Sequence, residues 1–140
     1  MGYYVTLDNS TAVIKKENQD EAYKILCDLN KEDDLKRGGS FCGGKKTEKW
    51  FSWMDADYPE KCKDVIEIIE ELGFDGEVDD EGDFHINYYD NKTGQEKLFF
   101  ERIGHLVEGE MEWSGEDGHH FKWTFDDGEL NELSGKVIYE

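Results

Sequence analysis

The clearest pattern of hydrophobic and polar positions lies in the last third of the chain, between Leu98 and Glu140. Apolar residues occupy every second position of two neighbouring segments there, namely Met111, Trp113, Phe121, Trp123 and Phe125. A period of two is typical of a strand that buries one face. Gly and Asp cluster at 115–118 and 126–128, where they suit the positive φ of hairpin turns. We therefore predict a three-stranded meander whose aromatic face is covered by helices.

Three segments have apolar residues at the spacing of an amphipathic helix. They run from Asn18 to about Asn30, from Pro59 to Leu72, and from after Gly94 to about Leu106. The second is bounded most clearly, because proline is favoured at the first helical position and the glycine after Leu72 favours a stop. Its outward positions carry a row of acids: Glu60, Asp64, Glu67 and Glu71. Like charges at this spacing slightly destabilise a helix, so the row is a candidate binding surface.

Short segments rich in β-formers predict further strands. They are Tyr3–Leu7, Thr11–Lys15, Trp50–Met54, Phe74–Val78 and Phe84–Tyr89. From Trp50 onward the order is strand, helix, strand, strand, helix, strand, as in a ferredoxin-like split βαβ unit. We therefore predict an α+β fold, an antiparallel sheet with about three helices, built as a ferredoxin-like core with an added C-terminal meander.

The length of 140 residues predicts a single domain, 1–140. Within it we expect a strand–strand–helix piece at 1–30, a mobile loop at 31–49 and the core with its meander at 50–140. The loop is rich in glycine, and Gly39–Thr47 is close to the pattern of a phosphate-binding loop. That pattern requires Ser or Thr directly after the lysine, where this chain has Lys46, so we interpret the segment as a plain loop.

Charge is distributed unevenly along the chain. The formal charge at pH 7 is −19, from 35 acidic and 16 basic residues. Residues 1–50 hold nine of each, so the whole excess lies in 51–140, where 26 acids accompany seven bases. Such an excess costs stability through self-repulsion and exceeds what solubility requires. Its sign argues against direct binding of nucleic acid, which needs a basic surface.

No apolar run exceeds three residues, so we expect no membrane-spanning segment. The first residues lack the basic and apolar parts of a secretory signal. The three cysteines, Cys27, Cys42 and Cys62, are odd in number and widely spaced. Free thiols are typical of a reducing compartment, so we expect a cytoplasmic protein.

Motifs for metal binding and catalysis are weak. Acids alternate from Asp75 to Asp83, but the sixth and twelfth positions of this stretch are Asp80 and Ile86, where a calcium loop needs Gly and Glu. The pattern leaves open a weak cation site, and we expect no resident metal or cofactor. The four histidines accompany no nucleophile motif, and the carboxylates are too numerous to single out a catalytic pair. We therefore expect a protein that is not an enzyme.

The turn Gly115–Gly118, the aromatic strand after it and the turn Asp126–Gly128 resemble the ends of small proteins from prophages and mobile elements of Gram-positive gut bacteria. The resemblance covers residues 95–140 and carries over no functional residue. Many small acidic proteins of that setting block host defences, among them anti-CRISPR and anti-restriction proteins, some of which mimic DNA. The resemblance therefore implies an inhibitor of a host defence nuclease.

Together, charge and resemblance predict a non-catalytic inhibitor that binds the basic nucleic-acid groove of such a nuclease. The expected contacts lie on the helix 59–72 and on acidic turns: Glu60, Asp64, Glu67, Glu71, Asp79, Asp80, Glu81, Asp83, Glu116 and Asp117. One alternative is a scaffold or interaction protein that binds through an aromatic surface at Trp50 and Met54, with a merely solvated acidic face. Another is an acidic surface without a specific partner.

Overall fold

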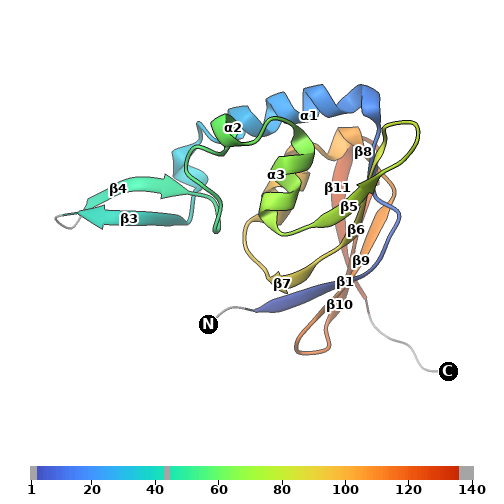
Figure 1. The fold of residues 1–140 in the computed structure, drawn as a ribbon. Coiled ribbons are helices and arrows are strands. Elements are labelled where there is room, and N and C mark those ends of the chain that lie inside the picture. The colour runs from blue at the N-terminus through green and yellow to red at the C-terminus, as the bar shows by residue number, and fades with distance from the viewer. Residues whose placement is uncertain (1–2, 43–44, 136–140) are drawn as a thin grey trace.

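The structure is a computed structural model, and it describes residues 3–42 and 45–135. These residues form an α+β fold, as the sequence predicts, in which helices lie on one side of antiparallel sheets (Figure 1). The hydrophobic core lies between the helices and the sheets.

Two sheets are joined by three bent segments of chain. One sheet has the strand order β11-β10-β9-β1-β7, and the other has the order β5-β6-β2-β8. The bent segments are β1 (Tyr4–Ser10) with β2 (Val13–Ile14), β6 (Phe84–Tyr88) with β7 (Asp90–Lys92), and β8 (Val107–Glu108) with β9 (Glu110–Gly115). The remaining strands of the sheets are β5 (Asp75–Val78), β10 (His120–Asp126) and β11 (Glu129–Gly135). Because the same three segments pass through both sheets, the sheets form one curved surface.

The bends have local causes. Gly109, between β8 and β9, has a φ of 101°, and a Cβ added there would lie 2.2 Å from the Thr11 carbonyl oxygen. Ser10 Oγ donates to the Ile86 carbonyl at 2.6 Å and accepts the Ala12 N–H at 3.1 Å. The turn that we expected to end at Ser10 therefore begins there, because β1 extends to this residue.

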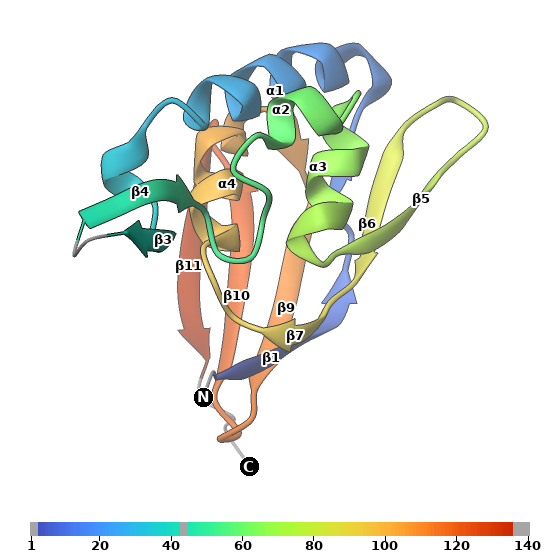
Figure 2. The same ribbon diagram turned by 60° about the vertical axis from the view of Figure 1, so that its left-hand side comes forward.

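The described helices and 3₁₀ turns are α1 (Lys16–Leu29), η1 (Asp33–Leu35), α2 (Tyr58–Lys61), α3 (Val65–Leu72), α4 (Glu96–Arg102) and η2 (Gly104–Leu106). Figure 2 shows α3 and α4 in front of the strands and α1 across the top. The three predicted helical segments are helical, but the segment from 59 to 72 is two helices. Cys62 interrupts it with an extended backbone (φ −95°, ψ 125°), and the Asp64 side chain caps α3.

The aromatic face of the meander forms the centre of the core. β9, β10 and β11 pair antiparallel, so that Trp113 lies beside Phe121 and Met111 beside Trp123. Trp113 is 1% exposed, and its ring centroid lies 4.8 Å from that of Trp123 and 5.9 Å from that of Phe74. The predicted meander with a helix-covered aromatic face is confirmed.

The segment predicted as a loop at 31–49 contains η1 and a hairpin of β3 (Gly38–Cys42) and β4 (Lys45–Trp50). In the part of the chain that the structure describes, these two strands pair only with each other. The hairpin projects from the body of the molecule (Figure 1). Gly43 and Gly44, at the centre of the segment close to a phosphate-binding loop, lie outside the described residues.

The predicted strand Trp50–Met54 is wrong. The chain turns after Trp50, with Ser52 at a φ of 48° and the Met54 N–H donating to the Phe51 carbonyl at 2.8 Å. The turn is held by hydrogen bonds to Gln95, which a local pattern does not reveal. β4 joins neither sheet, so the ferredoxin-like strand order is not formed.

Candidate functional site

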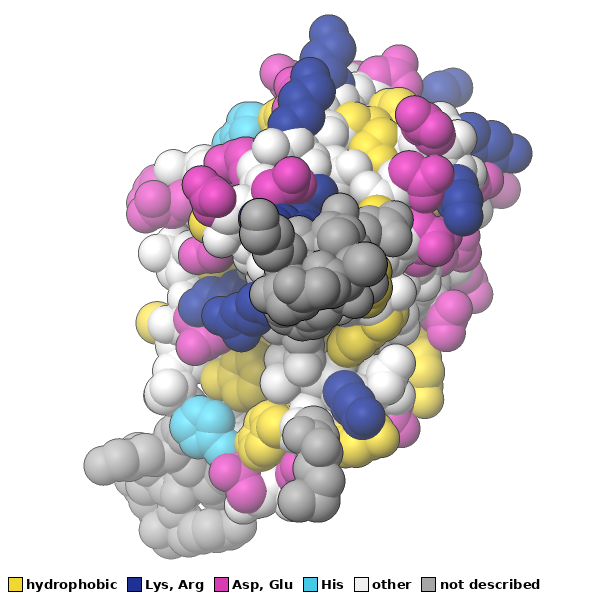
Figure 3. Space-filling model, turned by 90° about the vertical axis from the view of Figure 1, so that its left-hand side faces the viewer, with side chains coloured by type: hydrophobic (Ala, Val, Ile, Leu, Met, Phe, Trp, Pro, Cys, Tyr) yellow, Lys and Arg dark blue, Asp and Glu magenta, His cyan; other side chains and the backbone are white. Residues whose placement is uncertain are grey.

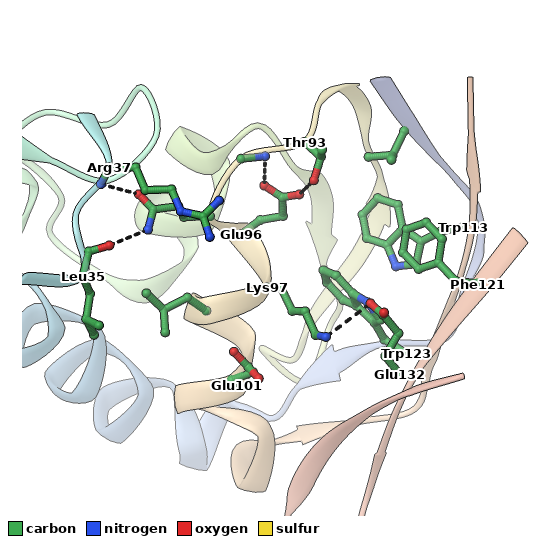
Figure 4. A pocket seen from close by; sticks show the side chains of 14 residues that line it. Leu35, Arg37, Thr93, Glu96, Lys97, Glu101, Trp113, Phe121, Trp123 and Glu132 are labelled. Carbon is green, nitrogen blue, oxygen red and sulfur yellow. Dashed lines mark hydrogen bonds and ion pairs between the residues drawn. The ribbon is translucent and has the colours of Figure 1, made fainter. Parts of the chain in front are cut away.

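A groove lies between α4 and the aromatic face of the meander (Figure 4). Trp113, Phe121 and Trp123 line one side of it, and Leu35 and Arg37 line the other. Its volume is about 420 Å³, which falls within the range of small-molecule sites. The groove exists because α4 does not cover the whole aromatic face, so that Phe121 stays half-buried while Trp123 is buried.

A buried amide holds the chain around this groove. Gln95 is 7% exposed, and its side-chain oxygen accepts the N–H groups of Arg37 at 3.0 Å and Ser52 at 3.2 Å. Its NH₂ group donates to the Leu35 carbonyl at 2.7 Å. Gln95 thereby places Arg37 at the groove. No local pattern marks Gln95 for this role, because its partners lie between 43 and 60 residues away along the chain.

The two cations at the groove differ in their surroundings. Lys97 Nζ lies 3.4 Å from Glu132 Oε1, which also accepts from Trp123 Nε1 at 2.9 Å. The Arg37 side chain is exposed, and among the side chains that the structure describes, those of residues 3–39 and 49–134, no carboxylate lies at ion-pair distance from its guanidinium. Arg37 is therefore the cation of the groove that lacks a described carboxylate partner, and Glu101 is an exposed carboxylate of the same groove that also lacks one.

The acids predicted to form one helical row are divided between two helices. Glu60 is exposed on α2, whereas Asp64 begins α3 by accepting the Glu67 N–H at 2.9 Å. Glu67 and Glu71 each accept another backbone N–H, at 3.0 and 3.1 Å. The prediction of one acidic row on one helix is therefore wrong, because the helix is interrupted between Glu60 and Asp64. Asp64, Glu67 and Glu71 instead hold the path of the chain around α3 through backbone hydrogen bonds.

Two predicted contacts in the β5–β6 turn also have internal partners. Asp79 accepts the N–H groups of Glu81 and Asp83, at 2.9 and 3.0 Å, and lies 2.7 Å from the His85 ring nitrogen. The His85 hydrogen bond, followed by the backbone donors, holds the pKa of Asp79 below its usual value. Asp83 is 7% exposed and accepts the Lys16 N–H at 2.8 Å. Asp83 is thus largely unavailable as a surface contact.

The predicted contacts in the β9–β10 turn fix the N-terminal strand. Glu116 accepts the Tyr4 N–H at 3.2 Å. Asp117 accepts the His119 N–H at 3.1 Å and the Tyr3 hydroxyl. The Tyr3 hydrogen bond holds the pKa of Asp117 below its usual value. Both carboxylates therefore make hydrogen bonds within the protein, whether or not they also contact a partner.

The β5–β6 turn meets the start of α1, where the Gln19 side chain donates to the Gly82 carbonyl at 2.8 Å. This contact brings the exposed carboxylates of Glu17, Asp20 and Glu81 around one hollow, which Lys15 and Lys16 also line. Asp80, exposed next to Glu81 in the turn, adds a fourth carboxylate, and we term these four acids the acidic tip. Among the described residues none of the four has an ion pair or accepts a side-chain hydrogen bond. Glu17 and Asp20 come from residues 1–50, which have no net charge, so composition did not single them out.

The predicted aromatic surface at Trp50 and Met54 is not formed. Met54 is 2% exposed in the core, and the half-buried Trp50 packs against Gly38. Trp53 is exposed instead, at 42%, because the chain turns at Ser52 and side chains after it no longer alternate as in a strand. On the side from which the hairpin projects, hydrophobic side chains are exposed among charged ones (Figure 3).

Nucleophilic and metal sites require particular surroundings of the cysteine, histidine and carboxylate side chains. Burial, together with the Glu71 carboxylate, raises the pKa of the Cys62 thiol to about 12 and so disfavours the nucleophilic thiolate. Over the described ranges, no three His, Cys, Asp or Glu side chains gather as a metal-ligand set. In the same residues, no helix is both long and apolar enough to cross a membrane.

No family model, curated protein or solved structure matches the chain. The structure itself therefore defines the class. It is an α+β protein with helices on one face of a curved antiparallel surface. Its two distinctive surface features are the aromatic groove and the acidic tip.

Proposed function

We propose that this chain is a non-catalytic acidic protein whose acidic tip binds a basic surface of a nucleic-acid-binding protein. The observation that carries the proposal is that exposed carboxylates from α1 and the β5–β6 turn, Glu17, Asp20 and Glu81, line one hollow and outnumber the nearby lysines Lys15 and Lys16, with the exposed Asp80 next to Glu81. The partner proposed is a host defence nuclease, the class that the resemblance of residues 95–140 implies. Occupation of its nucleic-acid groove would inhibit it without any reaction.

A single helical row of acids is too sparse to match DNA. Duplex DNA presents about one negative charge per 1.7 Å of axis, whereas one row on a helix presents about one per 5.4 Å. Acids from more than one element are needed to raise the charge density, and the tip draws on both α1 and the β5–β6 turn. A partner that binds phosphates with Lys and Arg would be attracted at long range, and salt would weaken the association.

The test compares two variants that each lose four negative charges. The tip variant carries Glu17→Gln, Asp20→Asn, Asp80→Asn and Glu81→Gln. The control carries Asp34→Asn, Asp126→Asn, Asp127→Asn and Glu129→Gln, all of them at exposed positions away from the tip. Each full chain is immobilised and exposed to a Gram-positive bacterial lysate, and bound proteins are eluted with salt and identified by mass spectrometry.

We expect the native chain and the control to retain a basic nucleic-acid-binding protein that elutes early in the gradient. The tip variant should lose it, and the native chain should inhibit the purified partner. Equal retention by the two variants would contradict the role of the tip. A partner that survives high salt and is lost with Trp53→Ser would contradict the proposal in favour of the aromatic alternative, and an empty eluate would favour an unpartnered acidic surface.

A further inference from the structure

The aromatic groove contains a buried hydrogen-bond donor without a partner. The indole Nε1 of Trp113 is buried and has no hydrogen bond among the described residues. Buried polar groups in folded proteins are nearly always paired, so an orphan donor beside a groove indicates a missing acceptor. Trp113 lines this groove, and Figure 4 places it across from Arg37. Both residues present donors and no acceptor.

Two of the three carboxylates that line the groove are occupied, whereas the third, Glu101, is exposed and has no described partner. Glu96 is 2% exposed, and its carboxylate accepts from Thr93 Oγ1 at 2.5 Å and from the Gly94 N–H at 2.7 Å. Glu132 is occupied by Lys97 and by the Trp123 indole. A ligand that complements the donors of Trp113 and Arg37 must supply acceptor atoms, and an anionic group suits the Arg37 guanidinium best.

The shape of the groove restricts the rest of the ligand. Trp113 and Phe121 are parallel within 5°, with ring centroids 5.8 Å apart, and Trp123 adds a third ring to the same side. Aromatic walls of this kind favour a flat apolar body that can stack or pack edge to face. Leu35 and Leu98 extend the apolar lining.

We propose that the groove binds a small planar aromatic carboxylate. Its ring lies against Phe121 and Trp123, its carboxylate pairs with Arg37, and an acceptor atom satisfies the Trp113 N–H. This site is separate from the acidic tip and does not depend on it. The competing occupant is an organic cation, which the net charge and the aromatic faces would attract.

Three probes of one ring system distinguish these ligands: 2-naphthoate, neutral 2-naphthalenemethanol and cationic 2-naphthylmethylammonium. The readout is the ¹⁵N–¹H NMR spectrum, in which the four tryptophans give four indole signals. We expect 2-naphthoate to shift the Trp113 and Trp123 signals saturably and the Trp50 and Trp53 signals little. A hydrogen bond to a charged group contributes about 1.5–3 kcal/mol, so the other probes should bind roughly tenfold or more weakly.

Arg37→Gln should reduce the affinity for 2-naphthoate at least tenfold, to that of the neutral probe. The matched control is Arg102→Gln, which removes the only other arginine of the chain, a residue paired with Glu32. It should leave the affinity unchanged. The Arg37 side chain is exposed and that of Arg102 is half-buried, so we expect both variants to fold. Near-UV circular dichroism of each variant checks this. No saturable shift with 2-naphthoate, tighter binding of the cationic probe, or an unchanged affinity in Arg37→Gln would overturn the proposal.

Discussion

At the scale of single residues, neighbouring carboxylates of identical chemistry differ in role. Asp79 organises its turn through two backbone N–H groups and His85, whereas the adjacent Asp80 is exposed and has no described partner. The pKa of Asp79 is lowered, so its charged form is favoured in the folded state. The stability that it adds is present above its unfolded pKa, about 3.9, and is lost as the pH falls through the folded value.

Asp79→Asn should therefore lower the urea midpoint at pH 7, because the charged acceptor of the turn is removed. It should also reduce the fall of the midpoint between pH 6 and pH 3. The matched control Asp80→Asn should show the native pH dependence at nearly native stability. The measurement is urea unfolding followed by tryptophan fluorescence across this pH range. Identical profiles for the two variants would mean that the Asp79 contacts add no stability.

At the scale of elements, the curvature of the sheets depends on close approach of neighbouring segments. Gly109 has a positive φ and leaves no room for a Cβ beside Thr11. Gly118, in the β9–β10 turn, also has a positive φ of 84°, but nothing lies within 4 Å of its added Cβ. Both glycines therefore need a positive φ, but only Gly109 lacks room for a side chain.

Gly118→Ala should cost roughly 1–2 kcal/mol, the strain of a left-handed backbone with a side chain. Gly109→Ala should cost a further 1–3 kcal/mol or so, because the clash with Thr11 forces the segments apart. The free energy of unfolding from urea titration measures both values. Equal losses of unfolding free energy in the two variants would contradict this expectation. They would show that the bend between β8 and β9 accommodates the added Cβ, and that Gly109 is required for its positive φ alone.

At the scale of the whole molecule, a net charge of −19 opposes folding through self-repulsion. Surface ion pairs act in the opposite direction, but exposed pairs contribute only about 0–1 kcal/mol each. The Debye length falls from about 30 Å at 0.01 M salt to about 10 Å at 0.1 M, so salt screens the long-range repulsion first.

We therefore expect the melting temperature to rise between 0.01 and 0.5 M NaCl, by roughly 4 °C for each kcal/mol of repulsion removed. The tip variant, with four fewer negative charges, should start from a higher value at low salt and rise less. Differential scanning calorimetry measures both, and potassium chloride in place of NaCl controls for specific binding of the sodium ion. A melting temperature that falls with salt would mean that ion pairs outweigh the repulsion.

Local patterns were sufficient where neighbours in sequence decide the structure. The alternation of Trp123 with polar residues predicted a strand because side-chain direction in a strand depends only on parity. Gly73 ended a helix as expected, with a φ of 116°, because its backbone freedom is local. The α+β class and the aromatic face of the meander follow from such patterns.

The amino-acid sequence by itself thus determined the α+β class, the aromatic meander and the charge of the chain. Only the tertiary structure decided how they combine. Gln95 converts a predicted strand into a turn and places Arg37 at the groove, through partners distant in sequence. The contact between α1 and the β5–β6 turn adds Glu17 and Asp20 to the acidic surface, although residues 1–50 have no net charge. Contacts between remote segments have no local signature, so periodicity and composition cannot reveal them.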